Sequence, residues 1–320
     1  MERNAIERAT TAARTALATG QAKDYLRASK SANTLKAYRS DWEHFTAWCR
    51  DQRIDPMPSS PETVAMYIAD LAESCKPSTI ARRLAAISVA HQAAGHDSPT
   101  RSIIVRDTLK GIRRTVGVAP DRKAAIRADH VREVAPKFSD GLQDLRDKAI
   151  LLIGYAGAFR RSELTSLNRE DIEFTKEGLR IVLRKSKMDQ EGEGQVKGIG
   201  YGANAVTCPV RALQAWIEAA DITTGPLFRP INRHGQMSPV RLSDKGISLI
   251  IKRIASKIGI DPEDVGGHSL RAGFVTDQYA KGTPEAAIMR QTGHKSRAIL
   301  GIYHREAGTF AFNYTAAAGL

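Results

Sequence analysis

Cysteine is scarce in this sequence, and long apolar runs are missing. Cys49, Cys75 and Cys208 are scattered over 320 residues, with no CxxC pair and no cluster of histidine beside them. Disulfide frameworks and structural zinc sites both need such spacing, so neither is expected. The longest apolar run, 149–159, is far shorter than the ~20 residues of a transmembrane helix. The N-terminus carries charges without an apolar core and is not a signal peptide, so we expect an intracellular protein.

Acidic side chains are outnumbered. The chain has 48 Lys and Arg against 35 Asp and Glu, a formal net charge of +13. This excess indicates a polyanionic partner, most simply nucleic acid, with an anionic membrane surface as the alternative. Residues 1–116 hold 18 basic and 12 acidic side chains (+6), which leaves +7 for the rest. Both halves can therefore face the same polyanion.

Length and composition predict two domains. Hydrophobic residues make up 42% of the chain, enough to form packed cores and to exclude a disordered protein. We interpret residues 1–22 as a flexible arm and 23–115 as an all-helical domain. The segment 116–126 contains several helix breakers and is predicted to be a linker, followed by a second domain over 127–320.

Hydrophobic periodicity places the secondary structure. In the first domain it predicts helices from Ser31, Pro61, Pro77 and Ile103, each near a capping residue or a proline of the first turn. In the second domain it predicts helices over 129–137 and 142–155, strands over 179–185 and 195–199, and only helices after Cys208.

Four polar clusters in the second domain carry groups that can do chemistry. They are Arg160-Arg161 with Glu163, the hairpin lysines Lys185 and Lys187, His268 with Arg271, and His294 with Tyr303. Taken singly, each has a commoner explanation, such as surface arginines, solubilising hairpin lysines or a packing tyrosine. Together they suit attack on a phosphodiester without metal. A phenol is the nucleophile, guanidiniums offset oxygen charge, and histidine and lysine move protons.

These motifs resemble, in order and spacing, the tyrosine recombinase (phage integrase) family. The resemblance rests on Arg160-x-Ser-Glu-Leu, the hairpin lysine, His268-x-x-Arg271, Gly293-His294, and Tyr303 nine residues later. It implies a mainly α fold with a small β-sheet, in which an all-helical, SAM-like core-binding domain precedes a mixed α/β catalytic domain. The chain is too short for an extra arm-binding domain, so it is similar to the two-domain recombinases of the Cre or Xer kind, and to those of mobile elements.

The resemblance also implies roles for individual residues. The arginines would clamp the scissile phosphate, the lysine would protonate the 5′-hydroxyl leaving group, and the histidines would hold the phosphate and assist proton transfer. The tyrosine would attack to leave a 3′-phosphotyrosine, with no metal, ATP or other cofactor. The implied catalytic set is Arg160, Lys187, His268, Arg271, His294 and Tyr303, with Glu163 in support. Arg161 stays open as the alternative to Arg160, and Lys185 as the alternative to Lys187.

The implied partner is double-stranded DNA with an inverted-repeat recombination site. Four protomers would assemble on this DNA and form a Holliday junction, whereas the free protein would be a monomer or a weak dimer. Accessory proteins could take part in the assembly, and a membrane would not. The location would be the bacterial cytoplasm, at the nucleoid. The apolar tail 310–320 would dock into a neighbouring protomer or fold back on its own domain. Candidate DNA-contacting residues on the first domain's helices are Asn33, Lys36, Arg39, Arg82 and Arg83.

Two other functions fit part of the evidence. A type IB topoisomerase-like enzyme shares the combination of arginine, lysine, histidine and tyrosine chemistry but works as a monomer without sequence demand. A non-catalytic helical DNA-binding protein fits the composition equally well. The products formed on DNA would distinguish the topoisomerase-like enzyme from a recombinase. The role of Tyr303 would distinguish the non-catalytic protein from a recombinase.

Overall fold

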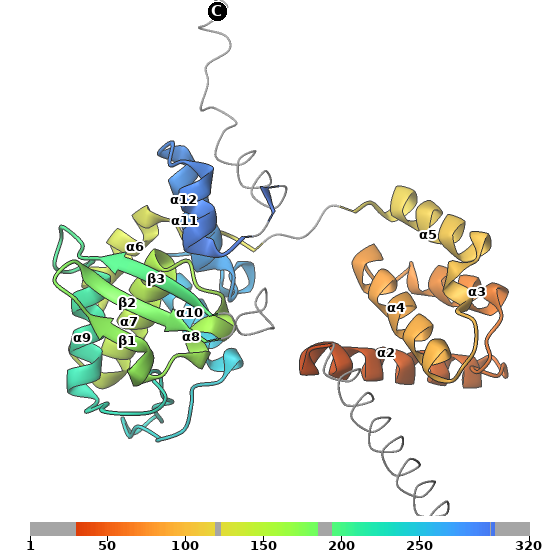
Figure 1. Ribbon diagram of the computed structural model, residues 1–320, viewed down its shortest axis with the longest axis horizontal. Coiled ribbons are helices and arrows are strands. Elements are labelled where there is room, and N and C mark those ends of the chain that lie inside the picture. Colours follow the sequence, from red (N-terminus) through yellow and green to blue (C-terminus); the bar gives the residue numbers. More distant parts are fainter. Residues whose placement is uncertain (1–29, 119–122, 185–193, 295, 298–320) are drawn as a thin grey trace, which may run out of the picture. The chain divides into compact units, whose positions relative to one another are not determined.

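The computed structural model describes residues 30–118, 123–184, 194–294 and 296–297 (Figure 1). The chain divides into two compact units, and the division falls between Asp121 and Arg122. That point lies inside the segment predicted as a linker. The arm 1–22, the tail 310–320, both hairpin lysines and Tyr303 lie outside the described residues.

The N-terminal unit is all-helical in its described part, as the sequence predicts. Its helices are α2 (Ala32–Asp51), α3 (Pro61–Leu71), α4 (Pro77–Ala93) and α5 (Ile103–Val116), with a 3₁₀ turn at Pro99–Arg101. The Ser31 hydroxyl accepts a hydrogen bond from the Thr34 N–H and so caps α2, and prolines occupy the first turns of α3 and α4. The apolar faces of these helices form one core around Phe45 and Ile68.

The second unit has its own core, built on a central helix. Its helices are α6 (Ala128–Val134), α7 (Leu142–Ala156), α8 (Arg161–Ser166), α9 (Pro209–Ala219), α10 (Asp244–Ser256), α11 (Ser269–Ala280) and α12 (Glu285–Thr292), with 3₁₀ turns at Ala135–Lys137, Arg169–Asp171 and Pro262–Asp264. Residues 149–154 of α7 are all buried, and α7 packs against α9 and α11. The expectation of helices alone after Cys208 is wrong for 221–243. Several prolines and glycines break that segment, and it holds an isolated bridge between Ile231 and Met237.

A small antiparallel sheet completes the second unit and confirms the predicted fold class. Its strands are β1 (Ile172–Phe174), β2 (Gly178–Leu183) and β3 (Gln195–Gly200), in the order β1-β2-β3 (Figure 1). The sequence did not predict β1, because three residues are too few to show alternation. Alternate residues of β2 face the core, and the register places Lys197 of β3 opposite the buried Ile181.

A glycine in α11 allows close backbone contact next to the site. A Cβ on Gly273 would lie 1.8 Å from the carbonyl oxygen of Ile126, so no other residue fits there without displacing the chain. The Ile126 N–H also donates to the Ser269 carbonyl at 3.0 Å. The segment that precedes α6 is therefore fixed along the first turns of α11, the helix that carries Arg271.

Candidate active site

The turn from α7 to α8, residues 156–160, is the centre of the site. The last carbonyl groups of a helix have no partner within the helix, and they carry partial negative charge. Here three successive carbonyls accept hydrogen bonds from three different elements. The donors are Gln291 Nε2 of α12 to Ala156 (3.0 Å), Lys197 Nζ of β3 to Gly157 (2.7 Å), and an Arg271 guanidinium nitrogen of α11 to Ala158 (2.8 Å).

Arg160 is held rigidly at the end of this turn. Its backbone N–H donates to one oxygen of Glu163 at 2.9 Å, and its guanidinium donates to the other at 2.5 Å. Both side chains are nearly buried, at 11% and 2% exposure. Burial alone would raise the pKa of Glu163, but the Lys197 charge and the hydrogen bonds from Arg160 hold that pKa below its usual value. Glu163 is therefore an ionised carboxylate that orients the guanidinium.

Arg161 turns away from this cluster. Its guanidinium donates to Ser248 Oγ on α10 at 2.9 Å, and its Nε lies 3.5 Å from a carboxylate oxygen of Asp244. Arg160 is thus the member of the arginine pair that faces Lys197 and Arg271. The choice depends on contacts with α10, which the local sequence does not contain.

Lys197 is a member of the cluster that sequence reasoning missed. Its side chain is fully buried, with Nζ 4.0 Å from Glu163 and 4.5 Å from the ring centroid of Phe159. Burial lowers the pKa of Lys197 to about 7; Glu163 opposes the shift, and the positive charges of Arg271 and Arg160 add to it. The sequence did contain a signal for the burial of Lys197. Alternate residues of a strand face the same side, so Lys197 lies on the same face of the predicted strand 195–199 as Ile199.

His294 follows a sharp turn at the end of α12. Gly293 has φ +68°, a left-handed conformation that glycine adopts without strain. The pKa of His294 is lowered to about 4, first by burial and then by nearby positive charge, Arg271 foremost. The Thr292 hydroxyl donates to the Ile288 carbonyl at 2.7 Å and lies 3.0 Å from His294 Nδ1. This arrangement favours a neutral imidazole with its proton on Nδ1 and a free lone pair on Nε2.

His268 and Arg271 lie on either side of the start of α11. His268 is the residue before the helix, and its side chain is exposed. Arg271 is 1% exposed. The charge of His268 contributes to the lowered pKa of His294, so the structure brings the two histidines near the same cluster.

The predicted DNA-contacting residues fall into two groups. Asn33, Lys36 and Arg39 are exposed on α2. Arg82 forms a two-pronged hydrogen-bonded ion pair with the buried Asp41, although half of its side chain is exposed. Arg83 is only 14% exposed and contacts the Tyr67 hydroxyl at 3.3 Å. Contact of these residues with DNA stays a prediction, and Arg83 in particular has a packing role inside the unit.

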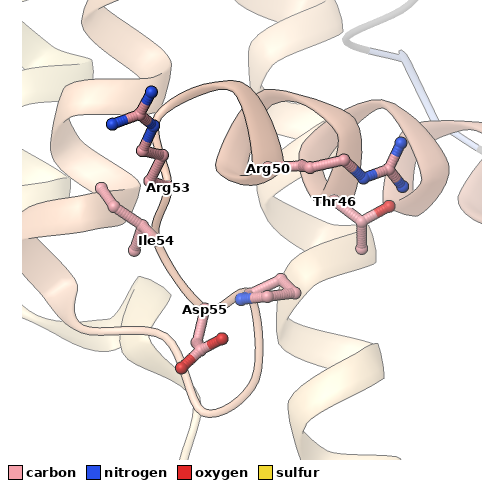
Figure 2. Close-up of a pocket in the computed structure, with 6 residues that line it drawn as sticks. Thr46, Arg50, Arg53, Ile54 and Asp55 are labelled. Atoms are coloured by element: carbon pink, nitrogen blue, oxygen red, sulfur yellow. The ribbon is translucent and has the colours of Figure 1, made fainter.

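A pocket in the N-terminal unit is separate from this chemistry (Figure 2). It is lined by Thr46, Arg50, Arg53, Ile54, Asp55 and Pro56. Arginine and aspartate side chains give its rim mixed charge, and none of the predicted catalytic residues lines it. The catalytic candidates that the structure describes all belong to the second unit.

The site is charged in a way that favours an anion. Arg160 and Arg271 are buried near Lys197, and Glu163 is the carboxylate that contacts Arg160 and Lys197. Within the described ranges, no three His, Cys, Asp or Glu side chains are grouped so that they could hold a metal ion. The helices in the same ranges include none that is long and apolar enough to cross a membrane. Buried guanidinium groups of this kind can form charge-assisted hydrogen bonds with an anion such as phosphate.

Comparisons with known proteins show which family and which solved structures the chain is similar to. The phage integrase family model matches residues 125–309, and the model of the phage integrase N-terminal SAM-like domain matches residues 23–97. An integrase/recombinase xerD homolog from Selenomonas ruminantium is 41% identical over 92% of this chain and 87% of its own length. Recombinase cre of Escherichia phage P1 is 25% identical over 86% of this chain and 84% of its own. A Tn1549 transposon integrase in complex with transposon right end DNA has the same fold, with a TM-score of 0.62, 15% identity, and coverage of 89% of this chain and 92% of that one.

Proposed function

Because this chain belongs to the phage integrase family and is a site-specific tyrosine recombinase, we propose that the cluster around the α7–α8 turn binds the scissile phosphate of double-stranded DNA. The observation that supports this assignment is that the basic side chains of Arg160, Lys197 and Arg271 are buried near one another, while Glu163 contacts Arg160 and Lys197 alone among them. Burying such an excess of charge is unfavourable without an anion, so the arrangement is explained by what it binds.

Arg160 and Arg271 are the proposed phosphate clamp. Each guanidinium is held by a hydrogen bond that it donates, Arg160 to the Glu163 carboxylate and Arg271 to the Ala158 carbonyl. Donors that are positioned in advance stabilise the charge that develops on the non-bridging oxygens without reorganising during the reaction. The partly exposed His294 and the exposed His268 complete the side chains offered to the phosphate.

Tyr303 is the proposed nucleophile. Its hydroxyl oxygen forms the new bond to phosphorus and the bond to the 5′-oxygen breaks, which leaves a 3′-phosphotyrosine. The neutral His294 offers an Nε2 lone pair that accepts the phenol proton. Lys187, with Lys185 as the alternative, donates a proton to the departing 5′-oxygen. A 5′-hydroxyl from the partner strand then reverses these steps, so the reaction uses no ATP.

The assembly is also a proposal. Family resemblance supports a tetramer on two inverted-repeat sites, exchange through a Holliday junction, and a monomer or weak dimer off DNA. The exposed side chains of Asn33, Lys36 and Arg39 are available to contact the same duplex. A DNA substrate supports a location in the cytoplasm, at the nucleoid.

The test is a covalent trap. The full-length protein is incubated with fragments of the DNA around its own gene, and the protein–DNA adducts are isolated and their ends sequenced. We expect adducts at one discrete position, and none with Tyr303→Phe although that variant still retards the same DNA. The exposed Tyr201→Phe is the matched control and is expected to form adducts normally. Adducts formed by the Tyr303→Phe variant would show that the nucleophile is another residue.

A further inference from the structure

The core-facing side of the sheet contains a lysine in an apolar row. Ile172 of β1 pairs with Ile181 of β2, which pairs with Lys197 of β3, and all three side chains are buried. The outward position next to it is occupied by Val196, which is 52% exposed. A strand selected for packing alone would place the valine inside and the lysine outside. The reversal indicates that the lysine is inside for a reason other than packing.

The surroundings of Lys197 show what it does there. Its ammonium donates to the Gly157 carbonyl, lies close to Glu163, and rests over the ring of Phe159. Gly157 is adjacent to Ala158, whose carbonyl accepts from Arg271, and Glu163 holds Arg160. One ammonium therefore contacts Glu163, which holds Arg160, and the carbonyl next to the one that holds Arg271.

We propose that Lys197 is a positioning residue of the recombinase active site, which fixes the Gly157 carbonyl and the Glu163 carboxylate so that Arg160 and Arg271 are aligned on the phosphate. This role rests on the proposed function of the cluster. It differs from that of the hairpin lysine, because Lys197 acts through Glu163 and the turn, whereas Lys187 is assigned to the leaving group.

The ammonium form of Lys197 is the one that serves this role, which makes alignment sensitive to pH. The charged and titratable groups that face it are Glu163 and Arg160 at α8, Arg271 of α11, and His294 after α12. The pKa of Lys197 in the free protein is about 7, and a bound phosphate adds negative charge that favours the protonated form. At DNA concentrations well below the Kd, the rate of covalent complex formation should therefore fall as pH rises through this pKa.

The experiment uses full-length protein and a nicked duplex that carries the cleavage position mapped with wild-type adducts. Lys197→Met keeps an unbranched side chain of similar length but loses the charge. We expect covalent complex formation at saturating DNA to slow by about 10–100-fold, because small misalignment of reacting groups has large effects. The Kd for DNA should stay within about threefold, and Tm is measured alongside because Lys197 is one partner of a buried charge pair with Glu163.

Two further variants complete the design. Lys257→Met is the matched control, because Lys257 also lies over a ring (Phe138, 4.7 Å) and near a carboxylate (Asp144, 3.6 Å), outside the cluster. Its cleavage rate should stay within about twofold of wild type. Lys197→Arg keeps a permanent cation, so it should recover part of the rate at pH 7. It should also lack the decline that wild type shows near pH 7 at dilute DNA.

Each outcome decides the matter. If Lys197→Met cleaves at the wild-type rate, the positioning role is overturned. The role is also overturned if the variant has a higher Kd for DNA but an unchanged cleavage rate. If Lys197→Met fails to fold, the pH profile of Lys197→Arg decides, and a decline near pH 7 identical to wild type would refute the role. If wild type itself forms no adduct, the proposed function fails first and this role fails with it.

Discussion

Arg271 and Ala158 are 113 positions apart in the sequence, and a single hydrogen bond of 2.8 Å joins the guanidinium of one to the carbonyl of the other. Ala158 has φ +47°, in the left-handed region that alanine rarely adopts. This conformation directs the chain from the end of α7 into Arg160. The same short turn therefore supports one arginine of the proposed clamp and leads directly into the other.

Glu163→Gln should destabilise the second unit by about 3–5 kcal/mol, because it leaves the charges of Arg160 and Lys197 buried without their carboxylate. Urea unfolding measures the change, with the exposed Glu177→Gln as control. Since the pKa of Glu163 is lowered in the folded protein, its contribution is present above the pKa of the unfolded chain. That contribution is lost as pH falls through the folded value. An equal effect of both substitutions would contradict the assigned contacts.

Thr292→Val should slow covalent complex formation by about tenfold while DNA binding stays unchanged. Valine keeps the shape but removes the oxygen that holds His294 Nδ1, so the ring loses its favoured tautomer. Thr276→Val is the control, since the Thr276 hydroxyl makes the same kind of bond to a helix carbonyl, that of Ala272 at 2.9 Å. Single-turnover cleavage of a nicked duplex measures both, and equal rates would remove Thr292 from the site.

The free energy of unfolding should rise as pH increases from about 7 towards 10.5. Lys197 loses its proton near pH 7 when folded, whereas 10.5 is the ordinary value for lysine. Between these values the unfolded chain binds more protons, so higher pH favours the folded state. Denaturant unfolding of wild type and Lys197→Met across this range isolates the contribution. A constant difference between the two proteins would show that Lys197 titrates normally.

Strand cleavage should be insensitive to EDTA. The proposed clamp meets the oxygen charge with guanidiniums, so chelation removes nothing that the chemical step uses. The yield of covalent adduct with and without EDTA at constant ionic strength is the measurement. A loss of adduct that Mg²⁺ restores would replace the proposed mechanism.

Arg39 and Arg83 should respond differently to alanine substitution. Arg39 is exposed on α2, so Arg39→Ala should weaken DNA binding by about 3–10-fold at low salt and leave stability unchanged. Arg83 contacts Asp41 and Tyr67, so Arg83→Ala should lower the unfolding free energy by about 1–3 kcal/mol. Gel retardation and thermal unfolding of both variants give the comparison. The opposite pattern would reassign both residues.

The sequence was a good guide wherever local chemistry decides the outcome. Ser31, Pro61 and Pro77 mark helix starts because capping and a fixed φ act within one turn. The strand β1 was missed because it exists only through pairing with β2, for example Ile172 with Ile181. Its own three residues show no pattern.

The site shows the same limit. The arginine, histidine and glutamate motifs were visible because they stand in a fixed order, but the choice between Arg160 and Arg161 depends on α10. Lys197 was missed because a lysine in a strand normally faces solvent. Its burial is decided by Glu163 and Gly157, which lie more than thirty positions earlier in the sequence.

The three carbonyls of the α7–α8 turn also set an order of events during synthesis. As the nascent chain leaves the ribosome, the turn emerges well before Lys197, Arg271 and Gln291, the side chains that bind its carbonyls. A ribosome-bound chain that ends within β3 already contains Arg160 but lacks the helix that carries the second arginine. The proposed phosphate clamp of this recombinase is therefore incomplete until Arg271 has been translated, well after Arg160.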